Sequence, residues 1–201
     1  MKKLLIMAVA LLTAGVASAQ ITYSIGYARA TSKVSYEEKL LGQTFSGSYN
    51  YNLNGFTISV DDNINLAGGF NVAPGLGMYL AFGSYQKTDL TKFGLYVPVD
   101  FNYGFALGSD VKLFIYAGPT LDLGLVYNGK PEKGDKESMY KEDAGNLSRF
   151  DLLLGGGAWV TFKDQYRIKV GVKAGMLNTC KSDNITMKNT VLPTVSFGYV
   201  F

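Results

Sequence analysis

Large apolar side chains alternate with small or polar ones, with a period of two residues, through much of this chain. The alternation is clearest from Tyr166 to Met176, where every second residue is apolar and the residues between them include Arg167, Lys169 and Lys173. Side chains of a β-strand point alternately to opposite faces, so this pattern predicts strands with one apolar and one polar face. Eight such segments occur, at about 21–28, 56–66, 70–84, 93–107, 111–127, 149–162, 166–176 and 190–201.

The lengths of these segments favour a membrane-spanning barrel. A tilted strand needs about ten residues to cross a bilayer, and an even number of strands lets an antiparallel barrel close. Three predicted turns are short, at 67–69, 108–110 and 163–165, and they alternate with longer polar connections at 31–54, 85–91, 128–148 and 178–189. That alternation is typical of outer-membrane barrels. We therefore predict an all-β fold: an eight-stranded antiparallel transmembrane up-and-down β-barrel.

The number of strands depends on one local signal. Asn54-Gly55 is a strong two-residue hairpin signal, and the alternating residues Phe45, Tyr49, Tyr51 and Leu53 precede it. Either the second strand begins early and carries a bulge at this point, or an added hairpin brings the number of strands to ten. We favour eight strands.

A secreted soluble barrel would show the same alternation, but with its apolar face turned inward. Only 17% of the residues are charged, which is below the quarter that is usual in soluble domains. The large apolar face has almost no charge, and the opposite face carries charged residues beside many small ones. Only a bilayer favours so many outward apolar side chains on a closed sheet. We favour the membrane barrel and the bacterial outer membrane as its location, with a soluble ligand-binding barrel as the less favoured alternative.

The polar face is expected to line a narrow lumen. Eight charged residues share this face, four of each sign: Asp61, Asp100, Asp122, Asp151, Lys112, Arg167, Lys169 and Lys173. An eight-stranded barrel is just wide enough for its own side chains, so paired charges would plug it. The alternative is a narrow channel for ions or small solutes.

The composition excludes several kinds of site. The chain has no His and one Cys, which removes His-based catalysis, His-ligated metals, Cys-rich zinc sites and an intramolecular disulfide. We expect no enzymatic activity, no cofactor and no metal. The formal charge is only +3, which gives no basis for nucleic-acid binding.

Residues 1–19 have the pattern of a secretory signal peptide. Two lysines precede an apolar run at 4–12, and the segment ends in the small residues Ala17-Ser18-Ala19. The run is too short to span a bilayer. We predict that residues 1–19 are cleaved and that residues 20–201 form the barrel.

Several segments resemble a known family. Lys92 to Asn128, with Tyr96-Val97-Pro98-Val99-Asp100, is similar to the outer-membrane β-barrel domain of PorT-like proteins of the Bacteroidetes, and so is the stretch from Phe150 to Gly157. The resemblance implies an integral eight-stranded outer-membrane protein and names no substrate. The aromatic residues Phe197, Tyr199 and Phe201 resemble the C-terminal signal that the barrel-assembly machinery recognises.

These observations lead to a functional expectation. We predict a monomer in outer-membrane lipid, with a plugged polar lumen, that acts through its extracellular loops in surface interaction or envelope integrity. The segments 31–54 and 128–148 are the candidates for contact with an extracellular ligand or protein, because variable function in such barrels is carried by loops.

Overall fold

The computed structural model describes residues 20–40, 43–182 and 184–201, so the predicted signal peptide at 1–19 lies outside the described residues. The chain forms one antiparallel sheet. Its strands are β1 (Gln20–Leu40), β2 (Gln43–Ala67), β3 (Phe70–Tyr85), β4 (Thr88–Ala106), β5 (Val111–Pro131), β6 (Glu137–Ser138), β7 (Phe150–Phe162), β8 (Tyr166–Gly175) and β9 (Ile185–Val200).

Eight of these strands close into a ring. The strand order is β4-β3-β2-β1-β9-β8-β7-β5, and the pairing of β4 with β5 closes the sheet. The two-residue strand β6 pairs only with β5 and stands outside the ring. The prediction of an all-β, eight-stranded up-and-down barrel is confirmed. The second strand begins early, at Gln43, and Asn54-Gly55 is not a hairpin turn. Both residues lie inside β2 and pair with Arg29 and Ala28 of β1.

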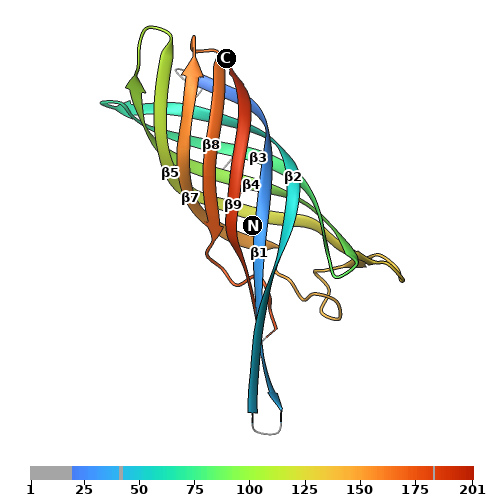
Figure 1. Ribbon diagram of the computed structural model, residues 1–201. Coiled ribbons are helices and arrows are strands. Elements are labelled where there is room, and N and C mark those ends of the chain that lie inside the picture. The colour runs from blue at the N-terminus through green and yellow to red at the C-terminus, as the bar shows by residue number, and fades with distance from the viewer. Residues whose placement is uncertain (1–19, 41–42, 183) are drawn as a thin grey trace, which may run out of the picture.

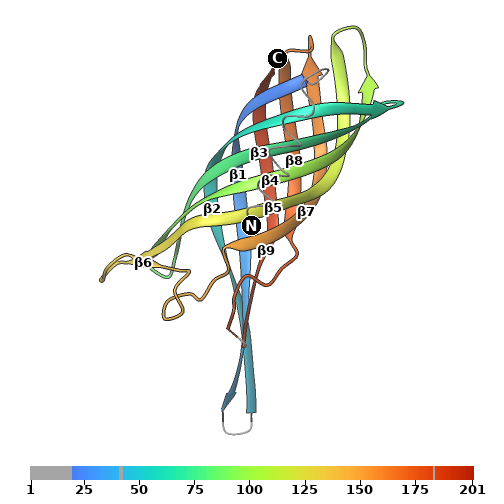
Figure 2. The same cartoon turned by 180° about the vertical axis from the view of Figure 1, so that it is seen from behind.

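The barrel turns its apolar face outward. Ile25, Ile58 and Val172 are each more than half exposed, whereas Asp61 and Asp100 are buried in the interior. This arrangement follows the predicted parity on all eight barrel strands over most of their length. A closed ring leaves no unpaired strand edge in the apolar zone, so lipid can cover the outer face without leaving backbone N–H or C=O groups unpaired. The chain has the architecture of an outer-membrane β-barrel (Figures 1 and 2).

Among the described residues, no helix is long and apolar enough to cross a membrane.

The parity changes once within β5, and this corrects one expectation. Phe93 pairs with Val126 but the next residue, Gly94, pairs with Gly124, so Leu125 is an extra residue in β5. Such a bulge moves every following side chain to the opposite face. Tyr127, which the alternation places outward with the apolar residues, is therefore only 3% exposed and lies inside the barrel.

The connections at the loop side differ from the predicted ones. The described residues of the segment 31–54, namely 31–40 and 43–54, lie in strands: Thr31 to Leu40 of β1 pair with Gln43 to Asn52 of β2, and the two strands project beyond the barrel as a long hairpin (Figure 1). The segment 85–91 contains only a two-residue turn at Gln86-Lys87, both with positive φ. The turn side matches the expectation more closely, with short turns at 68–69, 107–110 and 163–165.

Candidate functional site: the barrel lumen

The interior of the barrel contains a cavity of about 150 Å³ that charged and aromatic side chains line. One wall is made of small residues on three neighbouring strands, among them Ala28, Ala30, Gly55, Thr57, Thr194 and Ser196. The facing wall carries larger side chains from β3, β4, β5 and β8, among them Tyr79, Lys92, Tyr96, Tyr116, Lys169 and Lys173. The cavity lies beside these small side chains, which fill less of the lumen than the larger side chains do.

The turn-side part of the lumen is crossed by an ion pair. Arg167 of β8 donates from both terminal nitrogens to the carboxylate of Asp61 on β2, with 2.7 Å between Nη1 and Oδ1. Both side chains are almost completely buried. Since β9 and β1 stand between β8 and β2 in the ring, the pair reaches across the interior.

A second pair crosses in another direction. Lys169 of β8 donates to Asp100 of β4 at 2.6 Å, and β7 and β5 lie between these two strands. The Lys169 ammonium also lies over the rings of Tyr116 and Trp159, 4.4 and 5.0 Å from their centroids. Trp159 is 2% exposed, so this cation is held among aromatic faces within the barrel.

A third pair contains a lysine that the sequence analysis did not place in the lumen. Lys92 lies 3.1 Å from Asp122, and Tyr79 also donates to that carboxylate. The predicted strand begins at 93 and so does not include Lys92. Lys92 nevertheless has an even number, as the inward residues Tyr96 and Asp100 of the same strand have, and this parity indicates an inward side chain.

Two of the expected lumen residues have polar partners without an opposite charge. Lys173 donates to the hydroxyl of Thr120 at 2.6 Å. Asp151 accepts hydrogen bonds from the Asn189 amide at 2.8 Å and from the backbone N–H of Leu177. Among the described residues, neither charge has an oppositely charged side chain within 4.0 Å.

Lys112 corrects the expected set. Its ammonium lies 2.9 Å from Asp164 in the turn after β7, and its side chain is 40% exposed. This residue has the inward parity but stands at the very start of β5, where the side chain reaches solvent at the turn side. It is therefore separate from the other seven residues.

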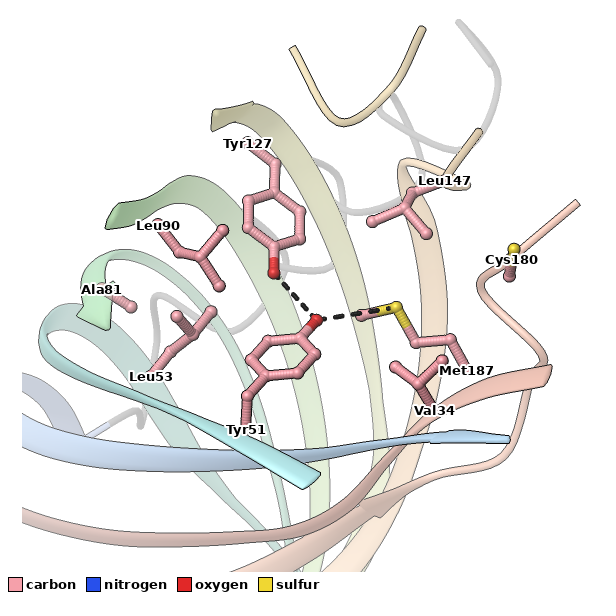
Figure 3. Close-up of a cluster of buried hydrophobic side chains, with 9 residues drawn as sticks. All are labelled: Val34, Tyr51, Leu53, Ala81, Leu90, Tyr127, Leu147, Cys180 and Met187. Carbon is pink, nitrogen blue, oxygen red and sulfur yellow. Dashed lines mark hydrogen bonds between the residues drawn. The ribbon is translucent and has the colours of Figure 1, made fainter. Parts of the chain in front are cut away.

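The loop-side part of the lumen is apolar. Its buried cluster, which we call the loop-side cluster, comprises Val34, Tyr51, Leu53, Ala81, Leu90, Tyr127, Leu147, Cys180 and Met187 (Figure 3). Within it the Tyr127 hydroxyl donates to the Tyr51 hydroxyl at 2.8 Å, and the Tyr51 hydroxyl points to the Met187 sulfur at 3.6 Å. The alternation does not predict this cluster, because the cluster consists of apolar side chains on the face that is otherwise polar.

The chain after β5 supplies a cover over this end. Met139 bonds to the Tyr127 carbonyl at 2.8 Å, and Leu147 bonds back to Met139 at 3.1 Å, so the segment 137–149 returns toward the barrel. Leu147 also forms an isolated bridge with Cys180 in the connection before β9. Burial raises the pKa of Tyr140 in this segment above the usual value for a phenol. The expected loop 128–148 is thus partly folded into the mouth of the barrel.

The described residues contain no group of three or more His, Cys, Asp or Glu side chains that could hold a metal ion. The chemistry available in the lumen is that of ammonium and guanidinium groups, carboxylates, phenols and hydroxyls.

No family model and no curated protein matches the chain. Among solved structures, Ail, the attachment invasion locus protein of Yersinia pestis, is 17% identical, with a TM-score of 0.46, over 90% of this chain and 98% of that chain. Neisserial surface protein A is 19% identical, with a TM-score of 0.45, over 87% of this chain and 95% of that chain. These similarities concern the architecture and assign no ligand or activity.

A further similar structure corrects one expectation. The outer membrane enzyme PagL is 15% identical, with a TM-score of 0.45, over 86% of this chain and 98% of that chain. We predicted from the absence of His that the protein is not an enzyme. Because an outer-membrane enzyme is among the similar structures, the prediction that this protein has no enzymatic activity is wrong. The similarity is too low to assign a reaction to this chain.

Proposed function

We propose that the protein is an integral outer-membrane barrel whose lumen is closed to ion flow and which presents its projecting β1–β2 hairpin to the outside in surface interaction or envelope integrity. The observation that carries the proposal is the pair of ion contacts, Arg167 with Asp61 and Lys169 with Asp100, each between strands that are not neighbours. Side chains that meet across an eight-stranded barrel leave little room for a continuous water path.

The energetics of these pairs support closure. Removing one partner of a buried ion pair leaves an uncompensated charge, at a cost of about 3–5 kcal/mol. A thermal fluctuation that opens the Arg167–Asp61 pair would meet a penalty of the same origin. The loop-side cluster adds an apolar barrier above the charged section, because ions lose hydration when they enter such a region.

The projecting hairpin supports a role at the surface. Tyr36 is 41% exposed and Phe45 is 53% exposed on the part of β1 and β2 that lies beyond the barrel. Exposed aromatic residues on a rigid paired scaffold are well suited to contact another molecule. The segment 128–148 stands at the same end of the barrel and is the second candidate surface (Figure 2).

The cavity of about 150 Å³ favours a second candidate function, a narrow channel for ions or small solutes. Conductance of the purified barrel in a planar lipid bilayer separates the two functions. The closed lumen predicts no steady channel in the wild type. Steady, charge-selective channels whose conductance changes in Asp100→Asn would overturn closure and establish the channel.

The proposal includes four further properties of the protein. They are cleavage after residue 19, membership of the PorT-like family, a monomeric state, and recognition of Phe197, Tyr199 and Phe201 by the barrel-assembly machinery.

The three aromatic residues face outward at the C-terminal end of the chain, and the rings of Tyr199 and Phe201 lie edge-to-face with 4.7 Å between their centroids. Outward aromatic side chains at this end are accessible to an assembly factor before the barrel closes. Deleting Phe201 should therefore lower the amount of folded barrel in the outer membrane.

A further inference from the structure

Lys173 is a buried cation inside the barrel that has no counter-ion in contact. The residue is 9% exposed, and its ammonium donates to the Thr120 hydroxyl. Among the described residues, no carboxylate oxygen lies within 4.0 Å of it, whereas Lys92, Arg167 and Lys169 each have one. An ionisable residue inside a membrane protein without a partner indicates a functional site.

The charges around the cavity leave an excess of positive charge. Five cations line it, namely Lys92, Arg149, Arg167, Lys169 and Lys173. The carboxylates of Asp61, Asp122 and Asp151 line it as well, and Asp100 is the partner of Lys169. Three of the four carboxylates are in ion pairs, and Asp151 is held by Asn189 and a backbone N–H. Arg149 is exposed and donates to the backbone carbonyls of Gly124 and Leu125, so Lys173 is the buried cation that meets an incoming anion without a carboxylate partner of its own.

The same cavity has apolar walls toward the loop side. Tyr51, Leu53, Leu147 and Met187 belong both to the loop-side cluster and to the cavity lining, and Figure 3 shows Tyr51, Leu147 and Met187 converging on one space. The small residues Ala28 and Ala30 form the side wall. A cavity of about 150 Å³ has the size that holds a benzene ring in an engineered protein interior.

We propose that the lumen cavity binds a small carboxylate with a compact apolar tail, with the carboxylate on Lys173 and the tail against the loop-side cluster. A carboxylate accepts from an ammonium in a charge-assisted hydrogen bond, which is stronger than the present bond to a neutral hydroxyl. The tail would be shielded from water by Leu147 and Tyr51. The charged end of the cavity at Lys173 and its apolar end at the loop-side cluster together select an amphipathic ligand and fix its orientation.

The ligand is expected to enter from the loop side. The turn side is crossed by Arg167–Asp61 and Lys169–Asp100, whereas the cover at the loop side is a returning chain segment that carries Leu147. Binding in this cavity goes beyond the proposed surface role. Binding requires only that the cavity be accessible from one end. The binding proposal can therefore be correct whether or not the lumen is closed to ions.

The test uses benzoate as the probe and isothermal titration calorimetry on the purified barrel in detergent. We expect a saturable heat for the wild type and at least a tenfold weaker Kd for Lys173→Met, which keeps an unbranched side chain of nearly the same length and removes the charge. Lys112→Met is the matched control, because Lys112 pairs with Asp164 at the turn side and does not line the cavity. It should bind benzoate as the wild type does.

Two further measurements keep the test decisive. Benzyl alcohol, which has the ring but no charge, should bind at least tenfold more weakly than benzoate. Ala28→Leu leaves Lys173 in place but fills the side wall, and it should abolish the saturable heat even if Lys173→Met fails to fold. A heat-dependent shift in gel mobility verifies that each variant is a closed barrel.

The outcomes separate this proposal from the proposed function. No saturable heat in the wild type, equal affinity in Lys173→Met, or equal binding of benzyl alcohol would overturn the carboxylate site. Channels in the planar bilayer would overturn closure of the lumen whatever the calorimetry gives. Benzoate binding without conductance is the result that supports both.

Discussion

Arg167 and Asp61 meet across the barrel although 106 residues separate them in the sequence. The guanidinium donates from both terminal nitrogens to one carboxylate, and a further hydrogen bond from Nη2 reaches Ser24 at 3.4 Å. The contact joins β8 to β2 and thereby ties opposite parts of the ring together. Arg167 also lies 5.4 Å from the Trp159 ring centroid, so the pair is packed on one side by an aromatic face.

Arg167→Met should destabilise the barrel by about 3–5 kcal/mol, because the Asp61 carboxylate would stay buried without its partner. Urea unfolding of the protein in lipid vesicles measures the change. Asp61→Asn/Arg167→Met removes both charges and should cost less than the sum of the two single changes. Strict additivity of the single changes would show that the two groups do not act as a pair.

Gly171→Ala should destabilise the barrel by about 1–3 kcal/mol, which is the usual cost of overpacking a filled interior. A β-carbon at Gly171 would overlap the Tyr116 hydroxyl, and Tyr116 is fixed between Trp159 and Lys169. Gly108→Ala is the control, because a β-carbon there meets no atom within 4 Å. Equal unfolding free energies for the two variants would contradict the described packing around Tyr116.

Val172→Arg should cost about 2–4 kcal/mol, whereas Leu107→Arg should cost about 0–1 kcal/mol. Both side chains face outward, but Val172 lies in the middle of β8 and Leu107 follows the end of β4 at the turn side. The penalty for an arginine facing lipid is greatest at the bilayer midplane. Vesicle unfolding measures both changes. A negligible cost at Val172 would mean that lipid does not cover this face.

Ser46→Cys should react with a membrane-impermeant maleimide in intact cells, whereas Ser109→Cys should react only after the outer membrane is broken. Ser46 lies on the projecting hairpin and Ser109 in a turn at the opposite end, and both are exposed. The native Cys180 is 6% exposed, so the folded wild type should give little background. Labelling of Ser109→Cys alone would place the barrel in the opposite orientation.

Alternation in the sequence was sufficient to predict the class of fold and most of the inward and outward residues. On β8 the sequence places Tyr166, Ile168, Val170 and Val172 on one face, and all four are exposed in the structure. A strand period of two places every second side chain on the same face, and the near absence of charge on the apolar face favoured lipid outside it. The prediction failed for Tyr127, since nothing local marks Leu125 as the residue that bulges.

The sequence indicates only part of the projecting hairpin. The alternating residues Phe45, Tyr49, Tyr51 and Leu53 allow an early start of the second strand, but the Ser-, Tyr- and Asn-rich composition of 31–54 is typical of a loop. In the described residues, Thr31 to Leu40 of β1 stay paired with Gln43 to Asn52 of β2. Backbone hydrogen bonds along two adjacent strands can extend a hairpin regardless of composition. Asn54-Gly55 likewise has the chemistry of a turn but is held in β2 by pairing on both sides, with Phe82 and Ala81 of β3 and with β1.

Side-chain parity is a local property of each strand, so the alternation alone predicts a barrel with an apolar exterior and a charged interior. Which charges meet is set by the closed ring. Whether Arg167 faces Asp61 or Asp100, and whether Lys173 has a carboxylate partner, depends on the order, stagger and closure of the ring, which set distances between residues far apart in the chain. The cavity has the same origin, since its lining brings together side chains of β1, β2, β3, β4, β5, β7, β8 and β9 that are far apart in the chain.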